Sequence, residues 1–526
     1  MVSQQPAFVS PEVSILVGDA LLSQFGNDNA VALHATRIMK TEDLHRQDDG
    51  QVDKRRIKRD LWGYDVHTHS NRCISLINKY YVQVLCYGRD KRVIIEAANA
   101  DRSCALACAL AAAYLWGLEK TDKLSPQVLV YLTAAKANWE SSSAYERLVV
   151  GALLDGIAGN DEVALNSHFE VLDSYPRDLA SLKRAQTLCF HMGRTSDMIR
   201  VAWQVLHMNG GSPYIYGMLS FGLLEVGSIR QAEKFARLAL LIEPQDVWAQ
   251  HALCHALQHQ CNFKEALDFM SKQSNSWDNC CTFIYVHNWW HMAVCQLELG
   301  GCDAIDKVLA IFDNQIWGGR PGHKTSQSHI DGLGLLLRLD LRGHGITVED
   351  RISQLADSVK ESMSCPQDEL LLEVLSVWAL SRADLLAEAK QKLKQIGSRS
   401  LALEGHEKEP WQSVAQLLTA VYEFGRANYE AVCQVMETPF NINSFKMLGA
   451  SNEQLEVFEE MWCVSHLQVG HFQRVIEVVK QRTRERPGIS FNWRILEEAY
   501  SNAGQGAEAQ LAATKAMALE AAANEG

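Results

Sequence analysis

The stretch Pro213–Asp246, PYIYGMLSFGLLEVGSIRQAEKFARLALLIEPQD, decides the fold. Its first half carries an aromatic residue, leucines and a small residue at helical spacing. Its second half carries alanines at the same spacing and ends at a proline, which cannot continue a helix. These positions are Tyr216, Leu219, Ser220, Leu223, Ala232, Ala236, Ala239 and Pro244. The pattern predicts two antiparallel helices, neither of which buries its apolar face alone.

The small residue of the first helix recurs along the chain. It falls at Ala152, Ala185, Ser220 and Cys254, at spacings of 33, 35 and 34 residues. The next small position is Ala293, five residues late, which predicts a short insertion near Asn275–Cys281. A period near 34 with this composition is typical of tetratricopeptide repeats, which stack helix pairs into one continuous core.

The sequence therefore predicts an all-α fold, a tetratricopeptide-repeat-like solenoid of antiparallel helix pairs that spans residues 61–526. Repeat units are expected near 145–177, 178–212, 213–246, 247–280, 286–319, 456–489 and 490–523. Residues 1–60 read as a partly flexible N-terminal extension. Its basic run Lys54–Arg59 fits either a nuclear import signal or a solvated helix start. The glycine-rich Gly318–Gly322 lacks the order of a phosphate loop and predicts a turn.

Composition narrows the class of partner and compartment. A net charge of −13 disfavours a nucleic-acid partner, which requires clustered lysine and arginine. No apolar run is long enough for a membrane helix, and the N-terminus lacks the pattern of a secretory signal. The 14 cysteines are scattered without a CxxC pair, as expected of reduced thiols. We expect a cytoplasmic protein with neither a nucleic-acid nor a membrane partner.

A dense cluster of histidine and tryptophan lies in the fourth and fifth repeats. In such repeats the first helices line a concave groove, and adjacent first helices bring the histidines of both repeats together. Glu225 of the third repeat stands nearby. Asp331 and Arg338 lie on a later helix, from His329 to Arg342, where either can enter the groove or both can form a surface ion pair. The candidate ligand-binding residues are Glu225, Trp248, His251, His255, His287, Asn288, Trp290, His291 and Asp331.

Three uses fit such a cluster. An aromatic and imidazole pocket can hold a flat or cationic small molecule, and a concave groove can bind a peptide. Histidines four residues apart on one helix can also bind a metal ion. However, HALCH at residues 251–255 contains no acidic residue, and no third acidic or cysteine ligand stands at clear spacing. The sequence therefore predicts no metal and no cofactor, and a purely structural core remains open.

The segment from Tyr216 to Gly300 resembles the tetratricopeptide repeat protein 38 family and its bacterial and plant relatives. The resemblance rests on SFGLLE at 220–225, DVW at 246–248, HNWWHMA at 287–293 and GASNEQ at 449–454, and it extends from Trp62 to the C-terminus. Gln258-His259 stands where relatives often have Glu-Met, and no histidine accompanies Glu373 where relatives often have an Asp-x-His-like pair. The resemblance implies a cytosolic helical-repeat protein and no particular reaction.

The function expected from these observations is a helical-repeat binding protein whose concave groove captures a protein, a peptide or a small molecule. The alternative is a hydrolase-like or isomerase-like enzyme that uses the histidine and tryptophan cluster, with or without a metal ion. Both departures from the family pattern, at Gln258 and near Glu373, weaken the enzyme alternative.

Overall fold

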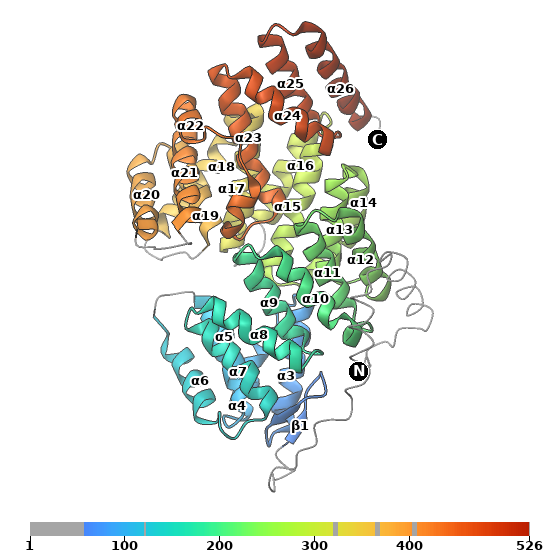
Figure 1. Ribbon diagram of the computed structural model, residues 1–526, viewed down its shortest axis with the longest axis vertical. Coiled ribbons are helices and arrows are strands. Elements are labelled where there is room, and N and C mark those ends of the chain that lie inside the picture. Colours follow the sequence, from blue (N-terminus) through green and yellow to red (C-terminus); the bar gives the residue numbers. More distant parts are fainter. Residues whose placement is uncertain (1–56, 120–122, 319–323, 363–368, 402–407, 525–526) are drawn as a thin grey trace.

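The computed structural model describes residues 57–119, 123–318, 324–362, 369–401 and 408–524 (Figure 1). Most of the predicted N-terminal extension and half of the basic run Lys54–Arg59 lie outside these residues, as does most of the predicted turn Gly318–Gly322. The predicted division into an extension, a solenoid and seven repeat units stays a prediction. None of the helices in the described residues is long and apolar enough to cross a membrane.

The described residues form helices apart from one short hairpin, so the predicted all-α solenoid is confirmed. Strands β1 (Ile57–Arg59) and β2 (Asp65–His67) pair antiparallel, with Lys58 opposite Val66. The carboxylate of Asp60 closes the connection by accepting hydrogen bonds from the backbone N–H groups of Trp62 and Tyr64. The sequence prediction missed this hairpin because strands of three residues are too short to show alternation.

The N-terminal helices form the lower body in Figure 1 and share one hydrophobic core. They are α3 (Asn71–Leu85), α4 (Val93–Ala100), α5 (Ala105–Glu119), α6 (Pro126–Ala137), α7 (Ala144–Ile157) and α8 (Asp161–Ser174). Helix α5 is alanine-rich and buried throughout its first two turns, because small side chains let its neighbours α4, α6 and α7 approach closely.

The central helices stack as regular pairs. They are α9 (Leu179–His191), α10 (Thr195–Asn209), α11 (Pro213–Glu225), α12 (Ile229–Ile242), α13 (Val247–His259), α14 (Phe263–Gln273), α15 (Thr282–Leu299) and α16 (Ala304–Ile311). First helices α11, α13 and α15 contact each other in sequence. The recurring small residues are 0–1% exposed, since each packs one helix against the next. The predicted insertion is the 3₁₀ helix η2 (Ser274–Asn279).

The turn between the helices of a pair repeats with the same period. Gly193, Gly227 and Cys261 all have a positive φ, at +69°, +78° and +58°. Glycine adopts this left-handed conformation without steric cost, whereas Cys261 does so because the turn that ends α13 requires it.

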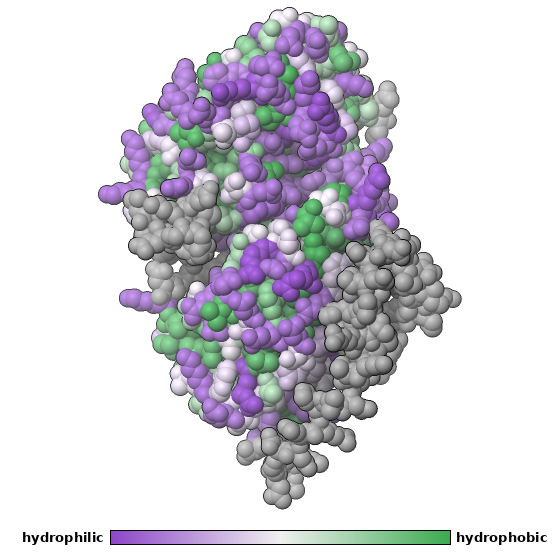
Figure 2. Space-filling model, viewed as in Figure 1, coloured by the Kyte–Doolittle hydropathy of each residue, from purple (hydrophilic) through white to green (hydrophobic). Residues whose placement is uncertain are grey.

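Beyond α16 the chain becomes less regular. The elements are η3 (Phe312–Ile316), α17 (Ser326–Leu339), η4 (Asp340–His344), α18 (Gly345–Glu361), α19 (Leu370–Arg382), α20 (Leu386–Leu401), α21 (Lys408–Gly425), α22 (Tyr429–Val435), η6 (Ile442–Leu448), α23 (Asn452–Val469), α24 (Phe472–Glu485), α25 (Ser490–Asn502) and α26 (Gly506–Asn524). Hydrophilic residues cover much of the face over the last helices (Figure 2).

The segment η6–α23 returns across the stack instead of extending it. Helix α23 contacts α17, and η6 contacts α9, although these elements are far apart in sequence (Figure 1). A capping box in which Ser451 and Gln454 exchange hydrogen bonds with each other's backbone fixes the start of α23. This return brings α23 to the histidine-bearing helices α13 and α15.

Candidate metal centre

Helices α13 and α15 present the four predicted histidines to each other. Asp246 caps α13 by accepting hydrogen bonds from the backbone N–H groups of Trp248 and Ala249, which fixes where the helix begins. One helical turn separates the histidines of each pair, so both imidazoles of a helix face the same side. The pairs are His251 with His255 on α13 and His287 with His291 on α15.

The four imidazoles meet in the interior. His251 Nε2 lies 2.8 Å from His255 Nε2 and 3.1 Å from His291 Nε2. The ring of His287 lies 5.1 Å from that of His251 and 4.8 Å from that of His291, between centroids. One nitrogen from each of the four rings lies within 4.8 Å of all the others. All four residues are buried, with His291 fully so.

Three of these rings are held from behind by acceptors. His287 Nδ1 lies 3.0 Å from Asp331 Oδ1 of α17, and His291 Nδ1 lies 2.6 Å from Gln258 Oε1. His255 Nδ1 lies 2.9 Å from Glu453 Oε1 of α23. His251 differs, because its Nδ1 has no hydrogen-bond partner in the described part of the chain.

These partners decide the tautomers. An ionised carboxylate only accepts hydrogen bonds, so the bond between His287 and Asp331 places the proton of His287 on Nδ1. The carbonyl oxygen of Gln258 places the proton of His291 on Nδ1 in the same way. The Nε2 atoms of His255 and His291 both face His251 Nε2, which can donate one N–H to them at most. The centre has more acceptors than donors, and a cation at that point would satisfy them.

Protonation of the histidines themselves is a poor source of positive charge at the centre of the cluster. Burial, followed by the neighbouring histidines, holds the pKa values of His251 and His291 well below the ordinary value of 6.5. Burial alone would raise the pKa of Glu453, but His255 and His259 outweigh it and hold that pKa well below 4.5. The rings of His251 and His291 are thus neutral near pH 7, as metal coordination requires, and the Glu453 carboxylate is ionised.

Aromatic side chains wall the cluster. Trp290 stacks on His287 with ring centroids 5.2 Å apart and planes 6° from parallel. Trp248 packs on His251 with ring centroids 4.7 Å apart, and the centroid of the Phe221 ring lies 5.9 Å from that of His251. These rings exclude water and restrict the rotation of the imidazoles.

The other predicted residues lie around the cluster in different roles. Asp331 holds His287 and also accepts a hydrogen bond from Gln454 of α23 at 3.4 Å. Glu225 instead pairs with Lys446 of η6 at 2.6 Å and does not contact the histidines. Asn288 is buried, and neither atom of its amide group has a hydrogen-bond partner among the described residues.

The concave side was expected to be an open groove, but beside the histidine cluster it is filled by segment η6–α23. Of the nine predicted residues, Trp248 is half-buried and the other eight are buried. A cavity bordered by Trp290, Asp331 and Gln454 has a volume of about 10 Å³. That volume admits one water molecule and no organic ligand.

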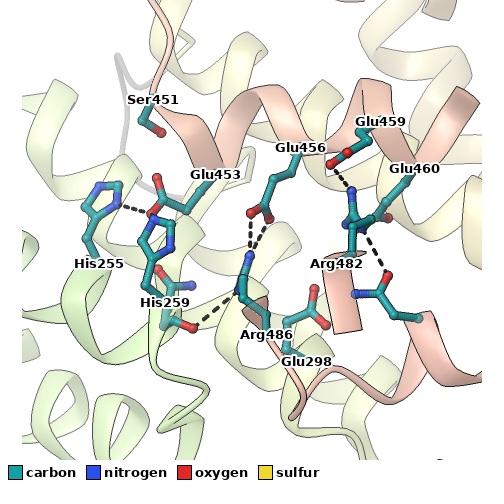
Figure 3. A network of polar contacts seen from close by, with 12 residues as sticks. His255, His259, Glu298, Ser451, Glu453, Glu456, Glu459, Glu460, Arg482 and Arg486 are labelled. Atoms are coloured by element: carbon teal, nitrogen blue, oxygen red, sulfur yellow. Dashed lines mark hydrogen bonds and ion pairs between the residues drawn. The ribbon is translucent and has the colours of Figure 1, made fainter. Parts of the chain in front are cut away.

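A belt of buried charges continues from the cluster along α23 (Figure 3). Glu453 lies between His255 and His259, at 2.9 and 2.8 Å. Further along, carboxylates of α23 meet arginines of α24, α17 and η4. The pairs are Glu456 with Arg486, Glu459 with Arg482, Glu460 with Arg338, and Glu460 with Arg342, which also reaches Glu298. Arg338, which the sequence left undecided between a groove residue and a surface ion pair, is a member of this belt.

Sequence reasoning missed Glu453. The segment that holds Glu453 was part of the family resemblance, and this was the one signal that pointed to it. The prediction of no metal rested on the lack of a third acidic or cysteine ligand at clear spacing, and it stays a prediction. Gln258, which stands where relatives often have an acid, accepts the contact from His291.

Comparisons with known proteins identify fold neighbours only. No family model matches the chain. The human IFIT1 dimer with PPP-AAAA is 13% identical, covers 85% of this chain and 90% of its own, and has a TM-score of 0.37. The P58(IPK) TPR domain is 14% identical over 71% of this chain and 92% of its own, with a TM-score of 0.20. At such scores nothing about ligands or partners carries over to this chain.

Proposed function

We propose that this protein is a metal-binding helical-repeat protein and that the histidines at 251, 255, 287 and 291 bind one Zn²⁺ ion. The observation that carries the proposal is the convergence of one nitrogen from each ring to within 4.8 Å, with His287 and His291 held from behind by Asp331 and Gln258. Neutral imidazole suits zinc, and four such ligands match its tetrahedral preference.

The distances support an ion of this size. Tetrahedral zinc with Zn–N bonds near 2.0–2.1 Å separates its ligand nitrogens by about 3.3 Å. His251 Nε2 already lies 2.8 and 3.1 Å from two of the others. These two spacings are a few tenths of an ångström shorter than the zinc value, and all four ligand atoms lie within 4.8 Å of one another.

The outer partners supply the charge that a divalent ion needs. Glu453 and Asp331 contact ligand histidines, and no lysine or arginine side chain bonds to either carboxylate within the described residues. Carboxylates behind zinc-bound histidines orient the ring and strengthen its nitrogen as a ligand. A buried carboxylate without a cation is costly, and Zn²⁺ would compensate both.

We assign the ion a structural role. Structural zinc sites have four protein ligands, whereas catalytic sites keep one position for water or substrate. The neighbouring cavity has room for about one water molecule. Through its ligands and their partners, the ion would join α13, α15, α17 and α23, and so hold segment η6–α23 inside the solenoid.

Elemental analysis of the purified protein tests this proposal. We expect one firmly held zinc ion per chain, which is retained through gel filtration and lost in His255→Gln and His291→Gln. The control is His329→Gln on α17, because His329 is half-buried and bonds only to Thr325 and Ser358. Protein that carries no metal and does not bind added Zn²⁺ with a sub-micromolar Kd would contradict the proposal.

Native mass spectrometry of the same sample addresses the alternatives. An organic molecule or peptide that co-purifies and leaves in Trp290→Ala would favour capture in the concave groove, as the sequence suggested. An exchangeable water on the ion together with hydrolysis of a substrate would favour the enzyme alternative. The cytoplasmic location and the absence of a nucleic-acid partner stay predictions.

We also propose membership of the tetratricopeptide repeat protein 38 family, on the sequence resemblance described above. The proposal is supported by the positions of the residues that carry the resemblance. HNWWH at 287–291 supplies two of the proposed ligands, and GASNEQ at 449–454 supplies the carboxylate behind a third.

A further inference from the structure

A second cluster of metal-ligating side chains lies at the other end of α23, away from the four histidines. Cys433 of α22, His466 in the last turn of α23 and His471 at the start of α24 each offer one ligand atom. These three atoms lie within 4.8 Å of one another. We propose that Cys433, His466 and His471 form a second Zn²⁺ site, independent of the first, with its fourth position open to solvent.

Each ligand is held in place by an identifiable backbone feature. Gly470 has a φ of +90° and ends α23 in a left-handed turn, closed by a hydrogen bond from His471 N–H to the His466 carbonyl. This turn brings the two rings together, with their Nδ1 atoms 3.0 Å apart. Cys433 arrives from α22, whose C-terminal residue Met436 contacts the same part of α23.

Hydrogen bonds orient the His466 ring for the role of a ligand. Its Nε2 donates to the carbonyl of Met436 at 3.3 Å, and this carbonyl also accepts from Trp462 Nε1 at 2.9 Å. The proton therefore sits on Nε2, and the lone pair of Nδ1 points toward His471. The indole of Trp462 stacks on the His466 ring at 4.0 Å and prevents it from turning away. This is the arrangement in which a carbonyl orients a metal-bound histidine from behind.

The chemistry of the ligands suits zinc. Thiolate and imidazole are its preferred ligands, and three protein ligands leave a position for water.

Accessibility distinguishes this site from the buried one. His471 is exposed, while Cys433 and His466 are buried. An ion here would be reached by water and by chelators directly, so it should exchange much faster than an ion enclosed by four buried histidines. A simple hydrogen bond between the two histidines would explain their 3.0 Å distance without any metal, and the experiment must separate these two cases.

Cobalt substitution makes that separation. Co²⁺ bound to a thiolate shows a strong near-ultraviolet charge-transfer band, whereas Co²⁺ bound only by imidazoles shows weak visible bands. We expect the full-length protein titrated with Co²⁺ to show both signals, each saturating at about one equivalent. Cys433→Ser should abolish the charge-transfer band and leave the visible bands of the four-histidine site.

Two controls complete the design. Cys463→Ala removes a buried cysteine of α23 that is outside the cluster, and it should leave the charge-transfer band unchanged. His291→Gln should remove the imidazole-only signal and keep the thiolate band, so each site can fail without the other. Absence of a thiolate band in the folded wild-type protein, or its persistence in Cys433→Ser, would overturn the second site.

Discussion

At the scale of single residues, Glu453 is the contact on which the proposed buried site depends most. Its carboxylate lies 2.9 Å from His255 and 2.8 Å from His259, and thus links a proposed ligand to a helix that begins far along the chain. It places negative charge beside His255 and would therefore affect the proposed ion without touching it.

We predict that Glu453→Gln lowers zinc affinity about 10–100-fold and leaves the stoichiometry at saturation unchanged, since carboxylates behind zinc-bound histidines usually contribute that much. A competition titration against a chromophoric chelator measures the change. Glu459→Gln is the matched control, because Glu459 lies on the same helix but pairs with Arg482. Equal affinities in both variants would show that Glu453 does not support the ion.

A second residue-scale effect concerns Asp60 in the N-terminal hairpin. Burial raises its pKa to about 7, against the opposing hydrogen bonds from the backbone of Tyr64 and Trp62. Because the folded-state pKa exceeds the ordinary 3.8, folding takes up a proton. The favourable contribution is complete at low pH and is lost as pH rises from about 4 to about 7.

Asp60→Asn keeps the neutral form and an acceptor for the same backbone groups. We predict that it stabilises the N-terminal body near pH 8, by at most about 4 kcal/mol, and has little effect near pH 4. Thermal unfolding at the two pH values tests this. Asp65→Asn, at a half-exposed position of the same hairpin, should show no such difference. An equal effect of Asp60→Asn at both pH values would argue against a raised pKa.

The residue scale also shows how far sequence reasoning reaches. His251 and His255 could be paired from their spacing, and repeat geometry placed them opposite His287 and His291. The same reasoning could not find Glu453, because a contact between α13 and α23 depends on how the chain returns. It also treated Gln258 as the loss of an acid, whereas its carbonyl oxygen holds His291.

At the scale of elements, α23 is the helix whose burial departs most from what its sequence suggests. Its carboxylates at helical spacing are typical of a solvated face, yet Glu453, Glu456 and Glu460 are buried or nearly so. They are tolerated because arginines approach the same side. Arg486, just after α24, pairs with Glu456 (Figure 3), and Arg338 of α17 and Arg342 of η4 pair with Glu460. Periodicity could predict that α23 is a helix, but not which face is buried.

We predict that Arg342→Met destabilises the protein by about 3–5 kcal/mol, because it leaves buried carboxylates without their cation. Arg342 lies 2.6 Å from Glu298 and 3.0 Å from Glu460, and all three side chains are at most 7% exposed. Urea unfolding measures the change. Arg200→Met is the control, since its partner Asp197 and Arg200 itself are accessible to water, and it should cost less than about 1 kcal/mol. Similar losses in both variants would mean that burial of the belt does not matter.

At the scale of the whole molecule, the described residues form two hydrophobic cores. One joins α3–α8 with the start of α9, and the other extends from there to the C-terminal helices. Local repeat contacts could be predicted from the period near 34, because each helix pair contacts its neighbours. The return of η6–α23 could not, because it joins helices that are distant in sequence and leaves no periodic signal.

This organisation leads to a test of what the buried ion does. If it joins α13, α15, α17 and α23, its removal should loosen these helices and leave the N-terminal core unaffected, since repeat proteins transmit stability mainly to neighbours. A ligand at 1,000 times its Kd stabilises the folded state by about 4 kcal/mol, and local opening of the site would lose this stabilisation.

Hydrogen exchange with and without a strong chelator measures whether the proposed ion stabilises these helices. We predict faster exchange in the four joined helices and unchanged exchange in α3–α5. The variant Cys433→Ser lacks the second proposed site. Hydrogen exchange in this variant should therefore respond to the chelator in the same way as in the wild-type protein. Zinc that leaves with no change in these helices would mean that the ion is bound but does not hold the solenoid closed.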